Sequence, residues 1–454
     1  MTTRMFTRPT VRAALSAVRG ASPRAILAIG FGIFLLYAFP GYMSSDSVSQ
    51  LIEARTAIFT NAHPPLMAAE WRVLEVFVSG PLLMLLVQGA LFLGGLYALL
   101  RHRLAPRQAA AAAVALLLFP PILGTMAVIW KDSQMAAYLV AGIAALLGER
   151  LRHRLIGLVL MSAACAFRYN AAAAVLPLVG LLFVWKPGQR LWKRYPIAAA
   201  AFVAAVVVAF RVNSMLTVEP RFLSPAYTDI VGVLYYEAPR TDEDLRHLLR
   251  GTPLHVQDRI HETARALYSP RNSWQVNRGE GRLFDDPATP EHAAALSRAW
   301  KELILGDPGA YLRHRLAIFE ELLGLSDSPL WRPHYNGFVE TAEQMTWIDH
   351  VAYPSRFQQR VGDAFEALST DTPLFRPYMY AVLALALLVL CCRDRLTFAL
   401  LASGIVYELG YFPTVSTPDV RYSHWMIICT CMAALLLFVQ RYRAGRAPAC
   451  GAAA

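Results

Sequence analysis

Long apolar runs separated by short polar stretches dominate this chain. Ten of them approach or exceed the roughly 17 to 20 apolar residues that a helix needs to cross about 30 Å of hydrocarbon. They cover residues 24–40, 81–100, 109–129, 133–148, 153–167, 170–186, 196–214, 374–392, 396–412 and 423–440. The three runs between 133 and 186 are also compatible with two spans. The pattern predicts an all-α polytopic membrane protein with about ten transmembrane helices.

Clusters of Arg and Lys orient these spans, because basic residues collect on the cytoplasmic side of a membrane. The clusters fall in alternate gaps, at residues 4–24, 101–107, 150–154, 186–194, 393–395 and 441–446. Ten spans with this alternation place both termini in the cytoplasm. A basic N-terminal arm (residues 1–23) and a short tail (443–454) are expected there.

Composition agrees with a membrane protein, since soluble domains rarely combine 56% hydrophobic with 17% charged residues. The net charge of +11 is explained by the orienting clusters, so no nucleic-acid partner is inferred. Basic residues beside spans also favour anionic membrane lipids. Richness in Arg and Ala is typical of a high-GC bacterium, whose inner membrane would hold the chain with its external side in the periplasm.

The expected topology divides the chain into three main parts. A transmembrane core of about seven helices covers residues 24–214, a periplasmic and mainly helical domain covers 215–373, and about three further spans cover 374–442. A charged helix is expected in the domain at residues 241–250, and amphipathic helices are expected at 291–305 and 309–325.

The first external loop, residues 41–80, contains two amphipathic pieces broken at Pro64-Pro65. Such pieces lie in the plane of the membrane interface. Asp46 is a candidate catalytic carboxylate, although Ser44-Ser45-Asp46-Ser47 before a helical pattern also suits an N-cap. His63 is a candidate substrate or metal contact, and a simple loop residue is an equal alternative.

Further polar residues lie at the external ends of later spans. Lys131 and Asp132 follow the third span, where a snorkelling Lys with an N-cap Asp is the structural alternative. Arg168 and Tyr169 stand at the external end of a short span, against the positive-inside trend. Such an Arg usually has an anionic partner, either a protein carboxylate or a ligand phosphate.

The last external loop carries Asp419, Arg421 and Tyr422 at the entrance to the final span. Arg421 is again a basic residue on the expected external side, and Tyr422 also suits an interfacial aromatic. Phosphate-cradling Gly-rich loops, Cys/His metal spacings and internal repeats are not apparent, so soluble nucleotide-driven chemistry is unsupported.

Taken together, the chain resembles the GT-C class of membrane glycosyltransferases, which includes protein O-mannosyltransferases and the aminoarabinose transferase of lipid A. The resemblance rests on the architecture, Asp46 after the first span, the His63-Pro64-Pro65 turn, Asp132 at the next external turn and Arg421-Tyr422 before a late span. The segment from Trp300 to Arg315, with Asp307-Pro308 inside it, is also similar to related bacterial proteins. The chain departs from better-known members in having Ser44-Ser45-Asp46-Ser47 instead of two acids spaced by one residue.

The resemblance implies transfer of a sugar from a polyprenyl-phosphate-linked donor to an envelope acceptor, a lipid, glycan or protein, with inversion. Asp46 would accept the proton of the acceptor, and Asp132 would position Lys131, the acceptor or a metal ion. Lys131, Arg168 and Arg421 would bind the donor phosphate. His63, Tyr169, Asp419 and Tyr422 would contact substrate or metal, and a divalent metal ion stays open as the only cofactor considered.

Two rival functions fit the same pattern. An O-antigen-type polymerase or ligase would use the Arg-rich segment 215–373 as its active element. A lipid-linked-sugar flippase or transporter would carry charges near the bilayer midplane. The middles of the spans are nearly free of charge, which favours chemistry at the surface.

Overall fold

The computed structural model describes residues 20–219, 226–273, 275–276, 279–327, 330, 333–335, 337, 354–390 and 393–444. The expected N-terminal arm lies outside these residues except for 20–23, and the expected tail except for 443–444. Within the described ranges the chain is helical, and its only β-type pairings are isolated bridges.

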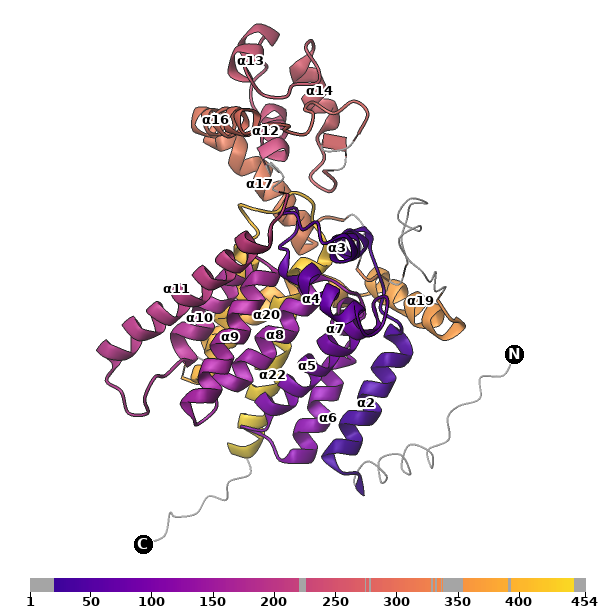
Figure 1. The fold of residues 1–454 in the computed structure, drawn as a ribbon, viewed down its shortest axis with the longest axis vertical. Helices are drawn as coiled ribbons and strands as arrows, with labels where there is room; N and C mark the ends of the chain where they lie inside the picture. Colours follow the sequence, from indigo (N-terminus) through magenta and orange to yellow (C-terminus); the bar gives the residue numbers. More distant parts are fainter. Residues whose placement is uncertain are drawn as a thin grey trace.

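A helix lies at each of the ten expected apolar runs (Figure 1). These helices are α2 (Pro23–Ala38), α5 (Leu82–Leu100), α6 (Pro106–Leu117) with α7 (Pro120–Met126), α8 (Lys131–Leu146), α9 (Leu151–Phe167), α10 (Ala171–Leu182), α11 (Leu191–Leu216), α20 (Pro377–Leu390), α21 (Arg395–Leu409) and α22 (His424–Ala444). The third run is not one straight helix, because α6 and α7 meet at 72° where Pro120 and Pro121 begin α7.

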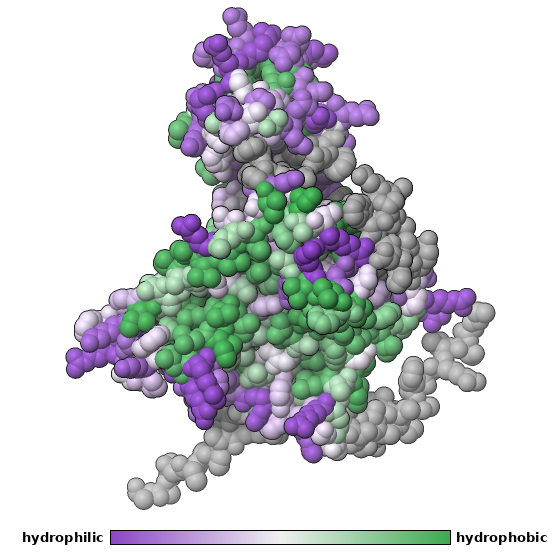
Figure 2. Space-filling view, in the orientation of Figure 1, coloured by the Kyte–Doolittle hydropathy of each residue, from purple (hydrophilic) through white to green (hydrophobic). Residues whose placement is uncertain are grey.

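Fewer of these helices have the full length of a membrane span. Among the described residues α5, α11 and α22 are long and apolar enough, and the bent pair α6 and α7 would make a fourth. Helices α2, α10 and α20 are apolar but shorter. The face of the bundle seen in Figure 2 is mostly apolar with polar groups near its edges, whereas the part above it is mostly polar. Membrane-spanning character is thus supported, and the number of ten spans stays a prediction.

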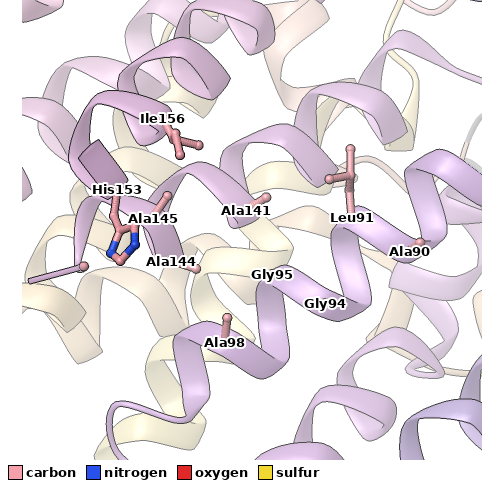
Figure 3. A pocket seen from close by; sticks show the side chains of 11 residues that line it. Ala90, Leu91, Gly94, Gly95, Ala98, Ala141, Ala144, Ala145, His153 and Ile156 are labelled. Atoms are coloured by element: carbon pink, nitrogen blue, oxygen red, sulfur yellow. The ribbon is translucent and has the colours of Figure 1, made fainter. Parts of the chain in front are cut away.

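Helix α8 lies at the centre of the bundle, where glycines allow close approach of its neighbours. A Cβ on Gly95 of α5 would stand 2.8 Å from the backbone nitrogen of Ala141 in α8. A Cβ on Gly157 of α9 would stand 2.8 Å from the backbone nitrogen of Leu146. Beside these contacts lies a groove of about 370 Å³ lined mainly by Ala and Gly, with His153 at one end (Figure 3).

Two short helices, α3 (Ser45–Thr56) and α4 (Leu66–Glu75), lie at the end of the bundle that faces the polar head (Figure 1). They flank Pro64-Pro65, as the sequence predicts. Helix α19 (Arg356–Asp371) also packs against the bundle, where Gln358 donates to the carbonyls of Tyr37 and Phe39 at 2.8 and 2.7 Å.

The polar head contains α12 (Ala226–Tyr236), α13 (Asp242–Leu248), α14 (Ile260–Leu267), α16 (Pro290–Gly306) and the upper part of α17 (Pro308–Leu323). The head has its own apolar core, with Ile230, Leu234 and Leu296 fully buried. Helix α17 then descends to the bundle (Figure 1). Helices α13, α16 and α17 thus lie where the sequence predicts a charged helix and two amphipathic helices.

Between α7 and α8 the backbone is irregular, and side chains of the bundle donate hydrogen bonds to its carbonyl groups. Gln88 of α5 donates to the carbonyls of Met126 and Val128 at 2.8 and 3.1 Å. Gln134 of α8 in turn donates to Gln88 at 3.0 Å. Buried carbonyls without such partners would be costly.

Candidate functional site

Two backbone segments run side by side and bring the starts of α3 and α8 together. The amide of Tyr42 donates to the carbonyl of Ala127 at 3.0 Å, and the amide of Ile129 donates back to Tyr42 at 2.9 Å. Ser47 of α3 adds a hydrogen bond of 2.8 Å to the Ile129 carbonyl. The first external loop and the turn before Lys131 therefore form one surface.

The N-cap of α3 is Ser44, not Asp46. The backbone N–H of Ser44 donates to the Ser47 hydroxyl at 3.1 Å, and Trp130 donates its indole N–H to the Ser44 hydroxyl at 2.7 Å. Asp46 stands in the first turn, where the helix dipole favours a carboxylate. The capping interpretation of Asp46 is therefore wrong, and its carboxylate is available for other partners.

Asp46 contacts residues from three distant parts of the chain. Arg421 donates to Oδ2 of Asp46 at 2.7 Å, and Nε2 of His63 lies 3.9 Å from Oδ1. Lys131 donates to Nδ1 of His63 at 2.9 Å. The Asp46 side chain is 31% exposed, whereas Arg421 is almost buried. Asp46 is thus held by a buried cation and still reachable from outside.

The contacts set the charge states of Asp46 and His63. Burial alone would raise the pKa of Asp46, but the charges of Arg421 and Lys131 outweigh it and hold that pKa well below its usual range. Burial, together with the Lys131 charge, lowers the pKa of His63 to about 3. Because an ammonium can only donate, Nδ1 of the neutral ring accepts and its proton sits on Nε2, facing Asp46.

Asp132 and Arg168 form a second, buried ion pair at 2.8 Å. The N-cap of α8 is Trp130, so Asp132 is not a cap, and Lys131 contacts His63 instead of simply snorkelling. The sequence left open whether Arg168 pairs with a protein carboxylate or a ligand phosphate, and in the structure its partner is the carboxylate of Asp132.

Asp419 fixes Arg421 from the opposite side. The Asp419 carboxylate caps the 3-10 helix η2 (Val420–Ser423) by accepting from the Arg421 backbone N–H at 3.1 Å. The same carboxylate lies 3.1 Å from Nε of Arg421. The guanidinium also lies over the ring of Trp130, 4.6 Å from its centroid. One guanidinium therefore faces two carboxylates and an aromatic ring.

Tyr422 connects the two ion pairs. Its ring centroid lies 4.7 Å from the Arg168 guanidinium carbon and 5.3 Å from that of Arg421. Tyr411 stacks on Tyr422 with ring centroids 5.2 Å apart, and the Arg168 guanidinium lies over the Tyr411 ring as well. Cations over aromatic faces are stabilised by the ring quadrupole. The two pairs thus form one cluster, which we call the charge cluster: Asp46, His63, Lys131, Asp132, Arg168, Asp419, Arg421 and Tyr422.

Comparison of the chain with protein-family models, with curated proteins and with solved structures finds no match. The chemistry of the charge cluster is therefore argued from its own geometry.

Eight of the nine predicted site residues belong to this cluster, and Tyr169 does not. Its ring instead stacks on Phe210 of α11, with centroids 4.9 Å apart. Sequence analysis named Ser44 only as part of a capping motif, and it missed Trp130 and Tyr411. For Tyr411 the available sequence signal was its spacing of one helical turn from Tyr407. In the structure the two hydroxyls are joined by a hydrogen bond of 2.8 Å.

In the described part of the chain, no three His, Cys, Asp or Glu side chains lie close enough together to hold a metal ion. Asp46 and His63 make a pair at 3.9 Å that could offer two ligands. The metal requirement therefore stays open.

The charge cluster contains three carboxylates, three cations and a neutral His63. The more accessible members are Asp46, His63 and Lys131, whereas Asp132 and Arg168 are buried. Arg168 and Arg421 are paired with carboxylates, whereas the described hydrogen bond of Lys131 goes to the neutral His63 ring. This side of the cluster combines a carboxylate able to bind a hydroxyl with an ammonium able to bind an anion.

Proposed function

We propose that this chain is a membrane glycosyltransferase of the GT-C type. It would move a sugar from a polyprenyl-phosphate-linked donor to an envelope acceptor, a lipid, glycan or protein. The observation that carries the proposal is the partly exposed Asp46 carboxylate, set between the buried guanidinium of Arg421 and the His63–Lys131 pair. Inverting transfer from a lipid phosphate needs a carboxylate beside cations.

In the proposed reaction the acceptor hydroxyl oxygen attacks the anomeric carbon on the face opposite the lipid phosphate. A new C–O bond forms as the bond from the anomeric carbon to the phosphate oxygen breaks. The hydroxyl proton passes to Asp46, and the electron pair leaves with the lipid phosphate. Lys131 and Arg421 stabilise the charge that develops on the phosphate.

The ion pair with Arg421 makes Asp46 a weak base before the donor arrives. A donor phosphate would compete with Asp46 for Arg421, while Asp419 keeps the guanidinium in place from its other side. Loss of that pairing would raise the basicity of Asp46 when the acceptor is bound. Donor binding would in this way prepare the base.

Asp132 and Arg168 take supporting roles in this proposal. Arg168 is engaged by Asp132, so its part in phosphate binding would be long-range, through Tyr422.

The chain would lie in a bacterial inner membrane as a bundle of about ten spans, with both termini cytoplasmic and the charge cluster periplasmic.

The polymerase or ligase alternative requires free arginines in the long external segment. Many of those that the structure describes are engaged locally, in the pairs Arg240–Glu237, Arg246–Asp258, Arg259–Glu262, Arg271–Glu321 and Arg282–Asp285. This engagement favours the charge cluster as the reacting element.

Asp46→Asn and Lys131→Ala test the proposal in proteoliposomes supplied with polyprenyl-phosphate-linked sugars and membrane-extract acceptors. We expect wild-type transfer, a loss of about 100-fold or more in Asp46→Asn, and a smaller loss in Lys131→Ala. Membrane abundance of each variant is measured first.

Asp394→Asn is the matched control, because Asp394 also pairs with an arginine, Arg103 at 2.7 Å, at the opposite end of α5. It should keep full transfer. Retained transfer by Asp46→Asn would remove the base assignment, and movement of intact donor across the bilayer without transfer would establish the transporter alternative.

A further inference from the structure

A buried acid in the head gathers side chains from two other helices. Asp229 of α12 accepts from the indole N–H of Trp300 at 2.7 Å, and its Oδ1 lies 3.1 Å from Nε2 of His314 and 2.5 Å from Nη2 of Arg315. All three partners lie in the Trp300 to Arg315 segment noted in the sequence. Asp307, inside that segment, caps α17 by accepting from the Ala310 backbone at 2.8 Å.

The helices around Asp229 meet at a position that only glycine permits. A Cβ on Gly232, one turn after Asp229, would lie 2.1 Å from Nδ1 of His314. Asp229, His314 and Arg315 have side chains at most 2% exposed. This close, buried arrangement gives Arg315 a single defined position at the base of the head.

Arg315 reaches out of the head with its other nitrogen. Nη1 donates to the carbonyl of Val415 at 2.7 Å, in the loop between α21 and η2. A second tie joins the same loop to the head, where the Ser273 amide donates to the Thr417 hydroxyl at 3.2 Å and the two hydroxyls lie 2.5 Å apart. The loop of residues 413–419 is therefore fastened to the head on both sides of its centre.

The fastened loop leads directly into the charge cluster. Thr417 is followed after one residue by Asp419, which caps η2 and lies against Arg421. Because the loop has no regular structure of its own beyond this point, its ties to the head decide where η2 begins. A shift of η2 would move the Arg421 guanidinium away from Asp46.

We infer that Arg315, held by Asp229, is a positioning residue that seats the loop 413–419 and thereby fixes Arg421 beside Asp46. The kinetic part of this inference rests on the proposed function, whereas the structural part does not. The head is then a support for the charge cluster.

Arg315→Lys tests the inference, because lysine keeps a charge for Asp229 and lacks the planar fork that also reaches Val415. We expect amide hydrogen exchange in residues 413–419 to rise about 10-fold, with exchange in α16 unchanged. Carbodiimide labelling of Asp46 should rise in parallel as Arg421 withdraws. In a transfer assay the acid limb of the pH–rate profile should move to higher pH, which loss of folded protein would not cause.

Arg313→Lys is the control, since Arg313 lies on the same helix and donates to the Tyr236 carbonyl inside the head at 3.1 Å. Ser273→Ala gives a second, milder variant at the other tie. Unchanged exchange and unchanged Asp46 labelling in folded Arg315→Lys would overturn the inference. If wild type transfers no sugar, the proposed function fails, and the exchange and labelling results still decide the positioning role.

Discussion

Arg421 donates a hydrogen bond of 2.7 Å to Asp46, although 375 positions separate the two residues in the sequence. The pair closes the bundle, because it links the helix after the first apolar run to the entrance of the last. Asp419 holds the same guanidinium from a second side. Arg421 therefore organises the cluster, and Asp46 is its exposed end.

Arg421→Lys should weaken the cluster more than the retained charge suggests. A lysine ammonium cannot face Asp46 and Asp419 together with a planar fork. We expect a loss of about 2–3 kcal/mol in unfolding free energy, because Asp419 would remain buried with an incomplete partner. Thermal unfolding in detergent measures the loss, and a change within error of wild type would show that the second carboxylate adds nothing.

Arg168→Met should be more costly, since it leaves the fully buried Asp132 without its cation. Removing one partner of a buried pair typically costs about 3–5 kcal/mol, whereas replacing both partners costs less. The double variant Asp132→Leu with Arg168→Met should therefore be more stable than Arg168→Met alone.

The control for this pair is Arg246→Met, which breaks the exposed pair with Asp258 and should cost less than about 1 kcal/mol. Equal losses from Arg168→Met and Arg246→Met would contradict the assigned burial.

His63 should make stability depend on pH in mildly acidic solution. Its pKa is about 3 when folded and 6.5 ordinarily, so between these values the unfolded chain binds the extra proton. The contribution of His63 to the free energy of unfolding is complete above pH 6.5 and is lost as pH falls toward 3. The loss reaches about 2 kcal/mol at pH 5. Asp46, with its lowered pKa, loses its contribution only at still lower pH.

The measurement compares the melting temperatures of wild type and His63→Asn from pH 7 to pH 5. Asparagine keeps an acceptor for Lys131 and cannot titrate, so its curve should be flatter. Because other histidines also have lowered pKa values, only the difference between the two proteins is informative. Parallel curves would exclude a buried neutral His63.

Gly95→Ala should destabilise the bundle by about 1–3 kcal/mol, because the new Cβ meets the backbone of α8 and neither side can move freely. Gly94→Ala is a matched control one residue away, where a Cβ meets nothing within 4 Å. Thermal stability in detergent should fall only for Gly95→Ala. A similar fall in both variants would indicate a backbone effect instead of contact with Ala141.

Much of the fold follows from the apolar pattern, since helices lie at every expected run. The bend between α6 and α7 was missed, although Pro120-Pro121 inside the third run was a signal for it. Convergence of Asp46, Lys131 and Arg421 on one side could be predicted because topology constrains which ends share a face. Individual partners could not, because pairings such as Asp132 with Arg168 depend on helix rotation, which the apolar pattern leaves undetermined.

The capping of α3 shows a second limit. Ser44, Asp46 and Ser47 all suit the first turn of a helix, and local propensity does not choose among them. The choice falls to Trp130, whose indole hydrogen bond to Ser44 comes from another part of the chain. A long-range contact thus decided which residue caps the helix.

The amide of Gln88 ties the backbone before Lys131 to α5. It binds the carbonyls that precede Lys131 in place of water, so this stretch keeps its geometry whether or not the surroundings are hydrated. The position of Lys131 along the axis of the bundle is then fixed by α5 and not by the lipid. In bilayers of different thickness the lipid would have to adapt to the protein, by thinning or thickening around it, while the charged groups keep their spacing.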